Sequence, residues 1–256
     1  LGAESWIEIG RKIILNESER LFNSTGELRE GSVHYHLLIT SWYLECWLAA
    51  KATNRSEEGA LLDIVTSCLS AASFFNLPGG LPLVGDVSPD CTPNYLQCIL
   101  TGKIDGWLLN RTKGERQLVS RLITSLENRK RAKKLDDWWR FDLGPWSIIW
   151  PKVKSGWQSY PGHSHSDFGG FELHFSEEKI FVDIGRRSYD RVGDIDKSET
   201  AHNVLTIDKQ PAYPENRAYY NEEFRNSMVE TGPEWSRDES EVSVATKAFS
   251  RISGVG

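Results

Sequence analysis

The sequence predicts an α+β chain in which a helical region, residues 1–138, precedes an antiparallel β-sandwich, residues 139–256. Two observations carry this prediction. Before Trp139 the apolar residues recur every three or four positions, which is typical of amphipathic helices. After Trp139 they recur every second position, which is typical of strands with one buried face. No helical pattern separates these strands, and this favours a sandwich over alternating strands and helices.

The helical region contains three apolar stripes. They consist of Tyr35, Ile39, Trp42 and Cys46, then Leu61, Val65, Cys68, Leu69 and Ala72, then Leu118, Leu122 and Leu126. Residues 33–52 are apolar nearly all round, so we expect this helix to be buried between layers. Turn-forming residues at 76–80 and 90–93 mark breaks between helices, and a basic run at 129–134 is expected to close the last one.

Three segments of the second region alternate with a period of two. Phe171, Leu173 and Phe175 alternate with Glu172 and His174, Ile180, Val182 and Ile184 alternate with Phe181 and Asp183, and Val242 and Val244 alternate with Ser243 and Ala245. The chain stops soon after the last of these segments, and residues 1–6 already have the character of a helix interior. We therefore expect both the helical region and the sandwich to be incomplete in this chain.

The composition narrows the function classes. With 39% hydrophobic and 26% charged residues, the chain is expected to be a globular protein. Its net charge of -6 argues against nucleic-acid binding, although an acidic protein can still hold an acidic ligand in a local cationic cleft. No apolar run is long enough to predict a membrane span. The four cysteines match no metal motif, and we expect Cys46 and Cys68 to be buried packing thiols.

Histidines and carboxylates gather in one stretch of the second region. In an extended chain His163, His165 and Asp167 point to the same face. Asp183 and His202 lie at the ends of apolar segments, and a carboxylate at position 183 is costly to bury unless it is paired or bound to a metal. His165, Asp183 and His202 together offer two nitrogens and one oxygen, which suits a divalent metal, zinc above all. Their spacing predicts one ligand on each of three strands. The alternative for each histidine is a hydrogen-bonded polar residue without a metal.

Several separated motifs resemble the heparinase II/III-like family in order and spacing. They are Gly162-His-Ser-His-Ser-Asp, Phe171-Glu-Leu, Val182-Asp-Ile-Gly and Ala201-His-Asn-Val, and in the helical region Glu30-Gly-Ser-Val-His-Tyr-His and Leu83-Val-Gly-Asp. The resemblance spans residues 28–210. It implies a partial α/α toroid followed by an antiparallel β-sandwich, with the active site between them.

The resemblance also implies an activity and roles for individual residues. Members of this bacterial-type family cleave uronic-acid-containing polysaccharides, such as heparan sulfate and alginate, by β-elimination. Tyr35 is then expected to transfer the proton with His163 as its partner, and His165, Asp183 and His202 are expected to hold the metal. The family's Asn or His that neutralises the substrate carboxylate has no counterpart here, so we expect that it either precedes Leu1 or has been lost.

Three functions remain open from the sequence. The first is a polysaccharide lyase acting on an acidic glycan, in a periplasmic or secreted protein. The second is a metal-dependent glycan hydrolase with the same three ligands, and the third is a non-catalytic glycan-binding relative. Tyr35 on its own would be read as a core residue. Arg186 and Arg187 suit anionic groups of a substrate or a solvated turn, and Trp157 and Tyr160 suit a sugar platform or core packing.

Overall fold

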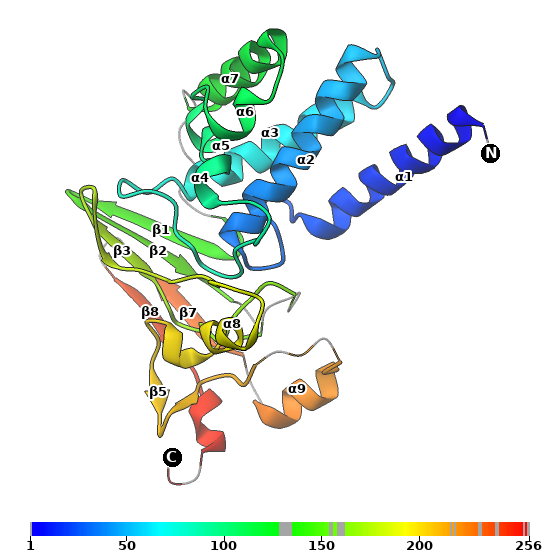
Figure 1. Ribbon diagram of the computed structural model, residues 1–256. Coiled ribbons are helices and arrows are strands. Elements are labelled where there is room, and N and C mark those ends of the chain that lie inside the picture. The colour runs from blue at the N-terminus through cyan, green and yellow to red at the C-terminus, as the bar shows by residue number, and fades with distance from the viewer. Residues whose placement is uncertain are drawn as a thin grey trace.

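The computed structural model describes residues 2–127, 135–153, 156–157, 162–215, 217, 219–229, 232–238, 241–252 and 254. The basic run at 129–134 and Tyr160 lie outside these ranges. Helices fill the first part of the chain and antiparallel strands dominate the second (Figure 1). The α+β class expected from the sequence is therefore confirmed. The division into two domains remains a proposal.

The helical part is built around α2 and α3. Its helices are α1 (Ala3–Leu21), α2 (Val33–Ala52), α3 (Glu58–Phe74), α4 (Pro93–Leu96), α5 (Cys98–Thr101), α6 (Gly106–Leu109) and α7 (Lys113–Glu127). Ser32 caps α2 by accepting a hydrogen bond from the backbone N–H of Tyr35. Most of α2 is buried, as its apolar character predicts, with Leu37 and Leu44 fully buried. None of the described helices combines the length and the apolar character needed to cross a bilayer.

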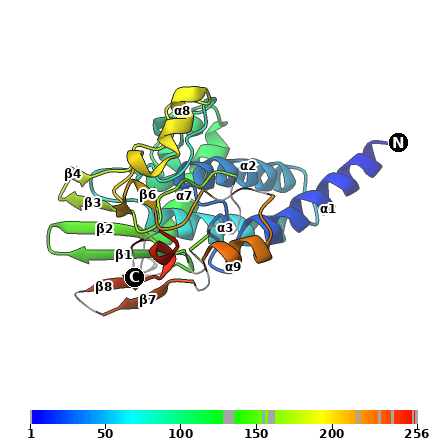
Figure 2. The same ribbon diagram turned by 90° about the horizontal axis from the view of Figure 1, so that it is seen from below.

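Four antiparallel strands form the main sheet in the order β1-β2-β3-β4. The hairpin of β7 (Glu234–Arg237) and β8 (Val242–Ala245) lies beside this sheet (Figure 2). The strands are β1 (Trp138–Leu143), β2 (Trp146–Pro151), β3 (Glu172–Phe175), β4 (Glu178–Phe181), β5 (Thr206–Ile207), β6 (Gln210–Pro211), β7 (Glu234–Arg237) and β8 (Val242–Ala245), and the intervening helices are α8 (Arg191–Asp196), η1 (Glu199–Ala201), α9 (Glu222–Met228) and η2 (Ala248–Arg251). Every pair of neighbouring strands is antiparallel.

The two faces of the main sheet have different neighbours. On one face Trp138 packs edge-on against Phe75, which follows α3. On this face Arg140 also donates hydrogen bonds to two carbonyl groups at the end of α3, those of Phe74 and Asn76. On the opposite face Trp139 packs edge-on against Trp235 of β7. The sheet is thus held between the helical part and the β7–β8 hairpin.

The face of β3 that points toward the helical part is polar. Glu172 and His174 are fully buried, whereas Phe175 is 40% exposed. The imidazole of His174 donates to Glu172 at 2.9 Å and accepts from the backbone N–H of Gly79 at 3.0 Å. The alternation expected for this strand is present, but it buries the polar residues, because a hydrogen-bonded pair meets the 77–83 loop there.

Candidate functional site

The loop that carries Asp86 is fastened to the first turn of α2. The backbone N–H of Val33 donates to the Val84 carbonyl at 3.1 Å, and the Ser32 hydroxyl donates to the Asp86 carbonyl at 2.7 Å. Gly85 has a φ of +80°, and a Cβ on it would lie 2.7 Å from the Gly31 carbonyl oxygen and 2.9 Å from that of His163. Glycine is therefore required at position 85. The close approach that it permits sets Asp86 beside the histidine cluster.

Asp86 is the centre of the hydrogen-bond network in this site. Its side chain is 1% exposed. One oxygen, Oδ1, accepts from His165 Nε2 at 2.9 Å, and the other, Oδ2, accepts from His163 Nδ1 at 3.1 Å. Arg186 adds a longer contact to Oδ2 at 3.4 Å. Burial raises the pKa of Asp86, but the hydrogen bonds from the two histidines outweigh burial and hold it well below its usual range. Asp86 is therefore an ionised acceptor.

Tyr35, in the first turn of α2, lies directly against His163. Their rings are stacked, with centroids 3.6 Å apart and planes 14° apart. The Tyr35 hydroxyl lies 3.0 Å from the Tyr189 hydroxyl, which in turn donates to Asp86 at 3.3 Å. Because Tyr189 spends its only hydrogen on Asp86, Tyr35 is the donor to Tyr189. The other ring nitrogen of His163, Nε2, lies 3.4 Å from a carboxylate oxygen of Glu30.

Tyr189 links the Tyr35 hydroxyl to Asp86. Burial is the main cause that raises the pKa of its phenol far above the usual range, and the hydrogen bond with Tyr35 and the charge of Asp86 add to it. The Tyr189 hydroxyl therefore stays protonated and remains a hydrogen-bond donor to Asp86. The guanidinium of Arg186 lies over its ring, 3.9 Å from the centroid.

His165, Asp183 and His202 form a group that can hold a metal ion. One potential ligand atom from each lies within 4.8 Å of the other two. His202 Nδ1 contacts Asp183 at 2.8 Å, and the other Asp183 oxygen accepts from the backbone N–H of Gly185 at 2.9 Å. Burial lowers the pKa of His202, but the hydrogen bond and charge of Asp183 outweigh burial and raise it overall.

The three residues lie on irregular segments rather than on three strands. His165 lies in an irregular segment, Asp183 follows the end of β4, and His202 directly follows η1. The expectation of one ligand per strand was therefore wrong. The strands are short, and the ligands occupy the connections beyond them, where the backbone can turn a side chain inward.

Unpartnered buried atoms show that the site fits a cation. His165 Nδ1, His202 Nε2 and Asp167 Oδ2 are buried and have no hydrogen-bond partner among the described residues. Burial raises the pKa of Asp167 to about 6, and the charge of Asp183 acts in the same direction. Buried polar atoms without partners are rare in proteins. Two imidazole nitrogens and carboxylate oxygens are a ligand set suited to zinc.

The other residues singled out from the sequence have three different surroundings: the site, an exposed ion pair and the core. The guanidinium of Arg186 reaches Asp86, as described, whereas that of Arg187 forms an ion pair with Asp196 at 2.6 Å. Trp157 is buried, and its ring meets that of Tyr213 edge-on at 5.8 Å, so it is a packing residue. Sequence reasoning did not assign roles to Asp86 or Tyr189. The Leu83-Val-Gly-Asp motif was the available signal for Asp86.

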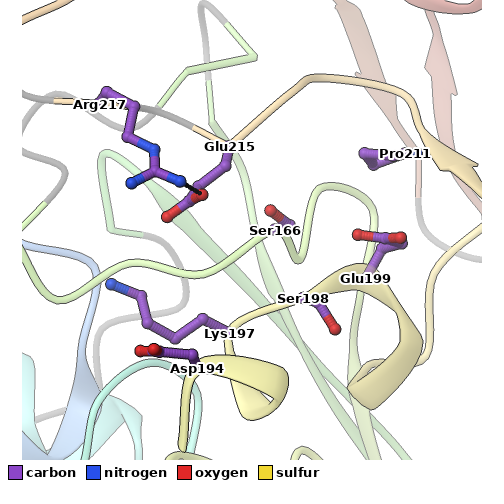
Figure 3. A pocket seen from close by; sticks show the side chains of 8 residues that line it. All are labelled: Ser166, Asp194, Lys197, Ser198, Glu199, Pro211, Glu215 and Arg217. Atoms are coloured by element: carbon purple, nitrogen blue, oxygen red, sulfur yellow. Dashed lines mark ion pairs between the residues drawn. The ribbon is translucent and has the colours of Figure 1, made fainter. Parts of the chain in front are cut away.

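A polar pocket of about 480 Å³ borders the histidine segment (Figure 3). Ser166, between His165 and Asp167, lines it together with Asp194, Lys197, Ser198, Glu199, Pro211, Glu215 and Arg217. Arg217 forms an ion pair with Glu215, whereas Lys197 has no ion-pair partner in the part of the chain that the structure describes. The volume suits a small ligand, and the side chains offer both charges and hydroxyl groups.

Comparisons with known proteins find one family model and several solved structures of similar fold. Residues 129–250 match the family model described as "Heparinase II/III-like, C-terminal". No curated protein matches the chain. Among solved structures, the heparan sulfate lyase HepC from Pedobacter heparinus matches 96% of this chain with a TM-score of 0.63 and 17% identity. A structure of heparinase III matches 97% of it with a TM-score of 0.66 and 18% identity.

The chain spans only part of each of these structures, 38% of HepC and 40% of heparinase III. At identities this low, the likeness shows the fold. A partial α/α toroid followed by an antiparallel β-sandwich is therefore confirmed as the architecture of the chain.

Proposed function

Because residues 129–250 match the heparinase II/III-like family model, we propose that the protein is a polysaccharide lyase that cleaves a uronic-acid-containing glycan by β-elimination. One observation carries the proposal. The Tyr35 ring is stacked on His163 at 3.6 Å, and its hydroxyl enters a hydrogen-bond chain that ends at the buried Asp86. The stack places two side chains that can each carry a proton side by side, where the helical part meets the irregular 162–167 segment.

The chemistry of elimination assigns work to this pair. A base removes the proton from C5 of the uronate, the electron pair forms the C4–C5 double bond, and the C4–O4 bond breaks. The departing O4 takes a proton from an acid, so no water is consumed. An ordinary tyrosine has a pKa near 10, so Tyr35 needs a neighbour that exchanges protons with it. His163 is that neighbour, and we assign proton transfer to Tyr35 with His163 as its partner.

His165, Asp183 and His202 are proposed to hold a divalent metal, with zinc the best fit to their atoms. When bound, the ion supplies positive charge among buried carboxylates and joins three connecting segments of the chain. His163 is proposed to stay outside the ligand set, because its Nδ1 is bonded to Asp86 and its Nε2 faces Glu30.

The pocket in Figure 3 is proposed to hold part of the substrate, with Lys197 as the cation that would meet an anionic group of the glycan. The carboxylates of this pocket can accept hydrogen bonds from sugar hydroxyl groups, and the amino group of Lys197 can hold a carboxylate or sulfate of the glycan. Ser166 joins this pocket to the proposed metal ligand His165. A substrate of this kind is consistent with a periplasmic or secreted protein.

Product analysis tests the proposal. The full-length protein is incubated with a panel of uronate glycans and, as control, with a neutral glycan. A lyase produces unsaturated uronates that absorb in the ultraviolet, and we expect this absorbance from at least one acidic glycan and none from the neutral one. New reducing ends without absorbance would replace the proposal with a metal-dependent hydrolase. Glycan binding without any cleavage would replace it with a binding protein.

A further inference from the structure

The proposed base pair and the proposed metal centre share one carboxylate, that of Asp86. Its oxygens are surrounded by donors: His165 at Oδ1, and His163, Tyr189 and Arg186 at Oδ2. A guanidinium has only donors, and the hydrogen of a protonated carboxyl group would have to point at one of these donors. The geometry therefore makes Asp86 an acceptor toward both histidines.

An acceptor at Asp86 fixes the hydrogen positions of both rings. His165 Nε2 lies 2.9 Å from Oδ1, so this nitrogen carries hydrogen. In a neutral imidazole Nδ1 then bears the lone pair, and His165 Nδ1 is the buried atom that lacks a partner among the described residues. His163 is fixed in the opposite sense, because its Nδ1 carries the hydrogen toward Asp86 and, in the neutral ring, Nε2 bears the lone pair.

The carboxylate is held rigidly enough to enforce this arrangement. The backbone N–H of Asp86 donates to the His163 carbonyl at 2.9 Å, and the backbone carbonyl of Asp86 accepts from Ser32. Gly85 allows that approach, as described above. The side chain and the backbone of Asp86 therefore hold the His163 segment at two points, and this segment continues directly into His165.

Resting on the proposed function, we propose that Asp86 is a positioning residue that sets the tautomers of both His163 and His165. It thereby leaves the lone pair of His163 on Nε2 and that of His165 on Nδ1, the nitrogen free to bind the metal. Carboxylates that orient metal-binding histidines in this way typically change metal affinity 10- to 100-fold when they are removed, as an order of magnitude. Asp86 differs from such a partner in serving a second ring with its other oxygen.

The test measures tautomers directly in the metal-free, full-length protein with ¹⁵N-labelled histidine. In the wild type, NMR should find hydrogen on Nε2 of His165 and on Nδ1 of His163. In Asp86→Asn the amide offers one accepting oxygen and one donating NH₂, so it can accept from only one ring. The other ring should turn a lone pair toward the NH₂ and move its hydrogen to the far nitrogen.

The consequence depends on which ring changes, and either result supports the proposal. If His165 changes, zinc affinity measured by chelator competition should fall by about 10- to 100-fold. If His163 changes, zinc affinity should persist while turnover falls by about 100-fold or more. The matched control is Asp142→Asn, which alters another carboxylate bonded to an arginine, Arg140, and should leave both tautomers and zinc affinity unchanged.

Two results would overturn the proposal. One is hydrogen on Nδ1 of His165 in the wild type, a measurement that holds even if Asp86→Asn does not fold. The other is a folded Asp86→Asn protein in which both tautomers and zinc affinity equal those of the wild type. Neither readout requires activity. Correct tautomers in a protein that forms no unsaturated product would therefore contradict the lyase and leave the role of Asp86 standing.

Discussion

Replacing Tyr35 with Phe separates catalysis from packing at the centre of the site. The change keeps the ring, so the stack on His163 at 3.6 Å should survive. It removes the hydroxyl and with it one hydrogen bond, the 3.0 Å contact with Tyr189. Ser32 still caps α2 through the backbone N–H of residue 35. Folding and metal content are therefore expected to be retained.

The structure predicts effects of different size on stability and turnover. Losing one hydrogen bond to a partly exposed hydroxyl should lower the free energy of unfolding by about 1 kcal/mol. Losing a group that transfers a proton should slow turnover by about 100-fold or more, which corresponds to about 2.7 kcal/mol in the barrier. Urea denaturation measures the first, and the ultraviolet absorbance of unsaturated uronates, recorded with the full-length protein, measures the second.

Tyr43 provides a matched control on the same helix. Its hydroxyl donates to the Ile14 carbonyl at 2.9 Å and lies in the core of the helical part. Tyr43→Phe should cost a similar amount of stability, about 1 kcal/mol, and leave turnover within about twofold. If Tyr35→Phe also retained most of the product formation, Tyr35 would be a packing residue and the assignment of proton transfer would be refuted.

Three other predictions concern the metal, the substrate and acid stability. Elemental analysis should show that His165→Ala loses metal and that His163→Ala retains it; loss in both would mean that the two roles are misassigned. Lys197→Ala should raise KM for an acidic glycan about tenfold with little change in kcat, and an unchanged KM would remove the pocket from substrate binding. Burial lowers the pKa of His36 from 6.5 to about 4, so the folded state holds its imidazole neutral. The contribution of His36 to the free energy of unfolding is fully present above pH 6.5 and is lost as the pH falls through about 4. Urea denaturation should show a loss of about 3 kcal/mol in the free energy of unfolding over this pH range. His36→Gln should flatten the plot of this free energy against pH, whereas an unchanged plot would refute His36 as the cause.

The order of helices and strands was predictable because local spacing determines it, but the direction of burial was not. In β3 the sequence alternates correctly, yet Glu172 and His174 point inward. Their burial depends on the backbone N–H of Gly79, which lies 95 positions before His174 in the chain. A periodic pattern records which residues share a face. It contains no information about a distant loop that supplies hydrogen-bond partners to the polar face.

The sequence predicted several residues of the candidate site, but not the hydrogen bonds that join them. His163 and His165 stood out because histidine is scarce in the sequence and only one residue separates these two. Asp86 lies 77 and 79 positions before them in the chain, inside a short motif that by itself does not indicate a role for its carboxylate. Tyr189 has no distinguishing local pattern. Their roles follow from the approach of the Gly85 loop to α2 and to residue 163, which only the folded chain establishes.

The charges around the triad form the physical argument for a cation at this site. Asp86, Asp167 and Asp183 are all buried, and burying a carboxylate costs several kcal/mol unless it is compensated. Asp86 is compensated by Arg186 and two histidines. Asp183 has His202 and one backbone N–H. Asp167 keeps an oxygen without a partner among the described residues. A divalent ion beside Asp183 would offset this excess of negative charge, whereas the alternative, a proton shared among the carboxylates, would leave His165 Nδ1 and His202 Nε2 buried without partners.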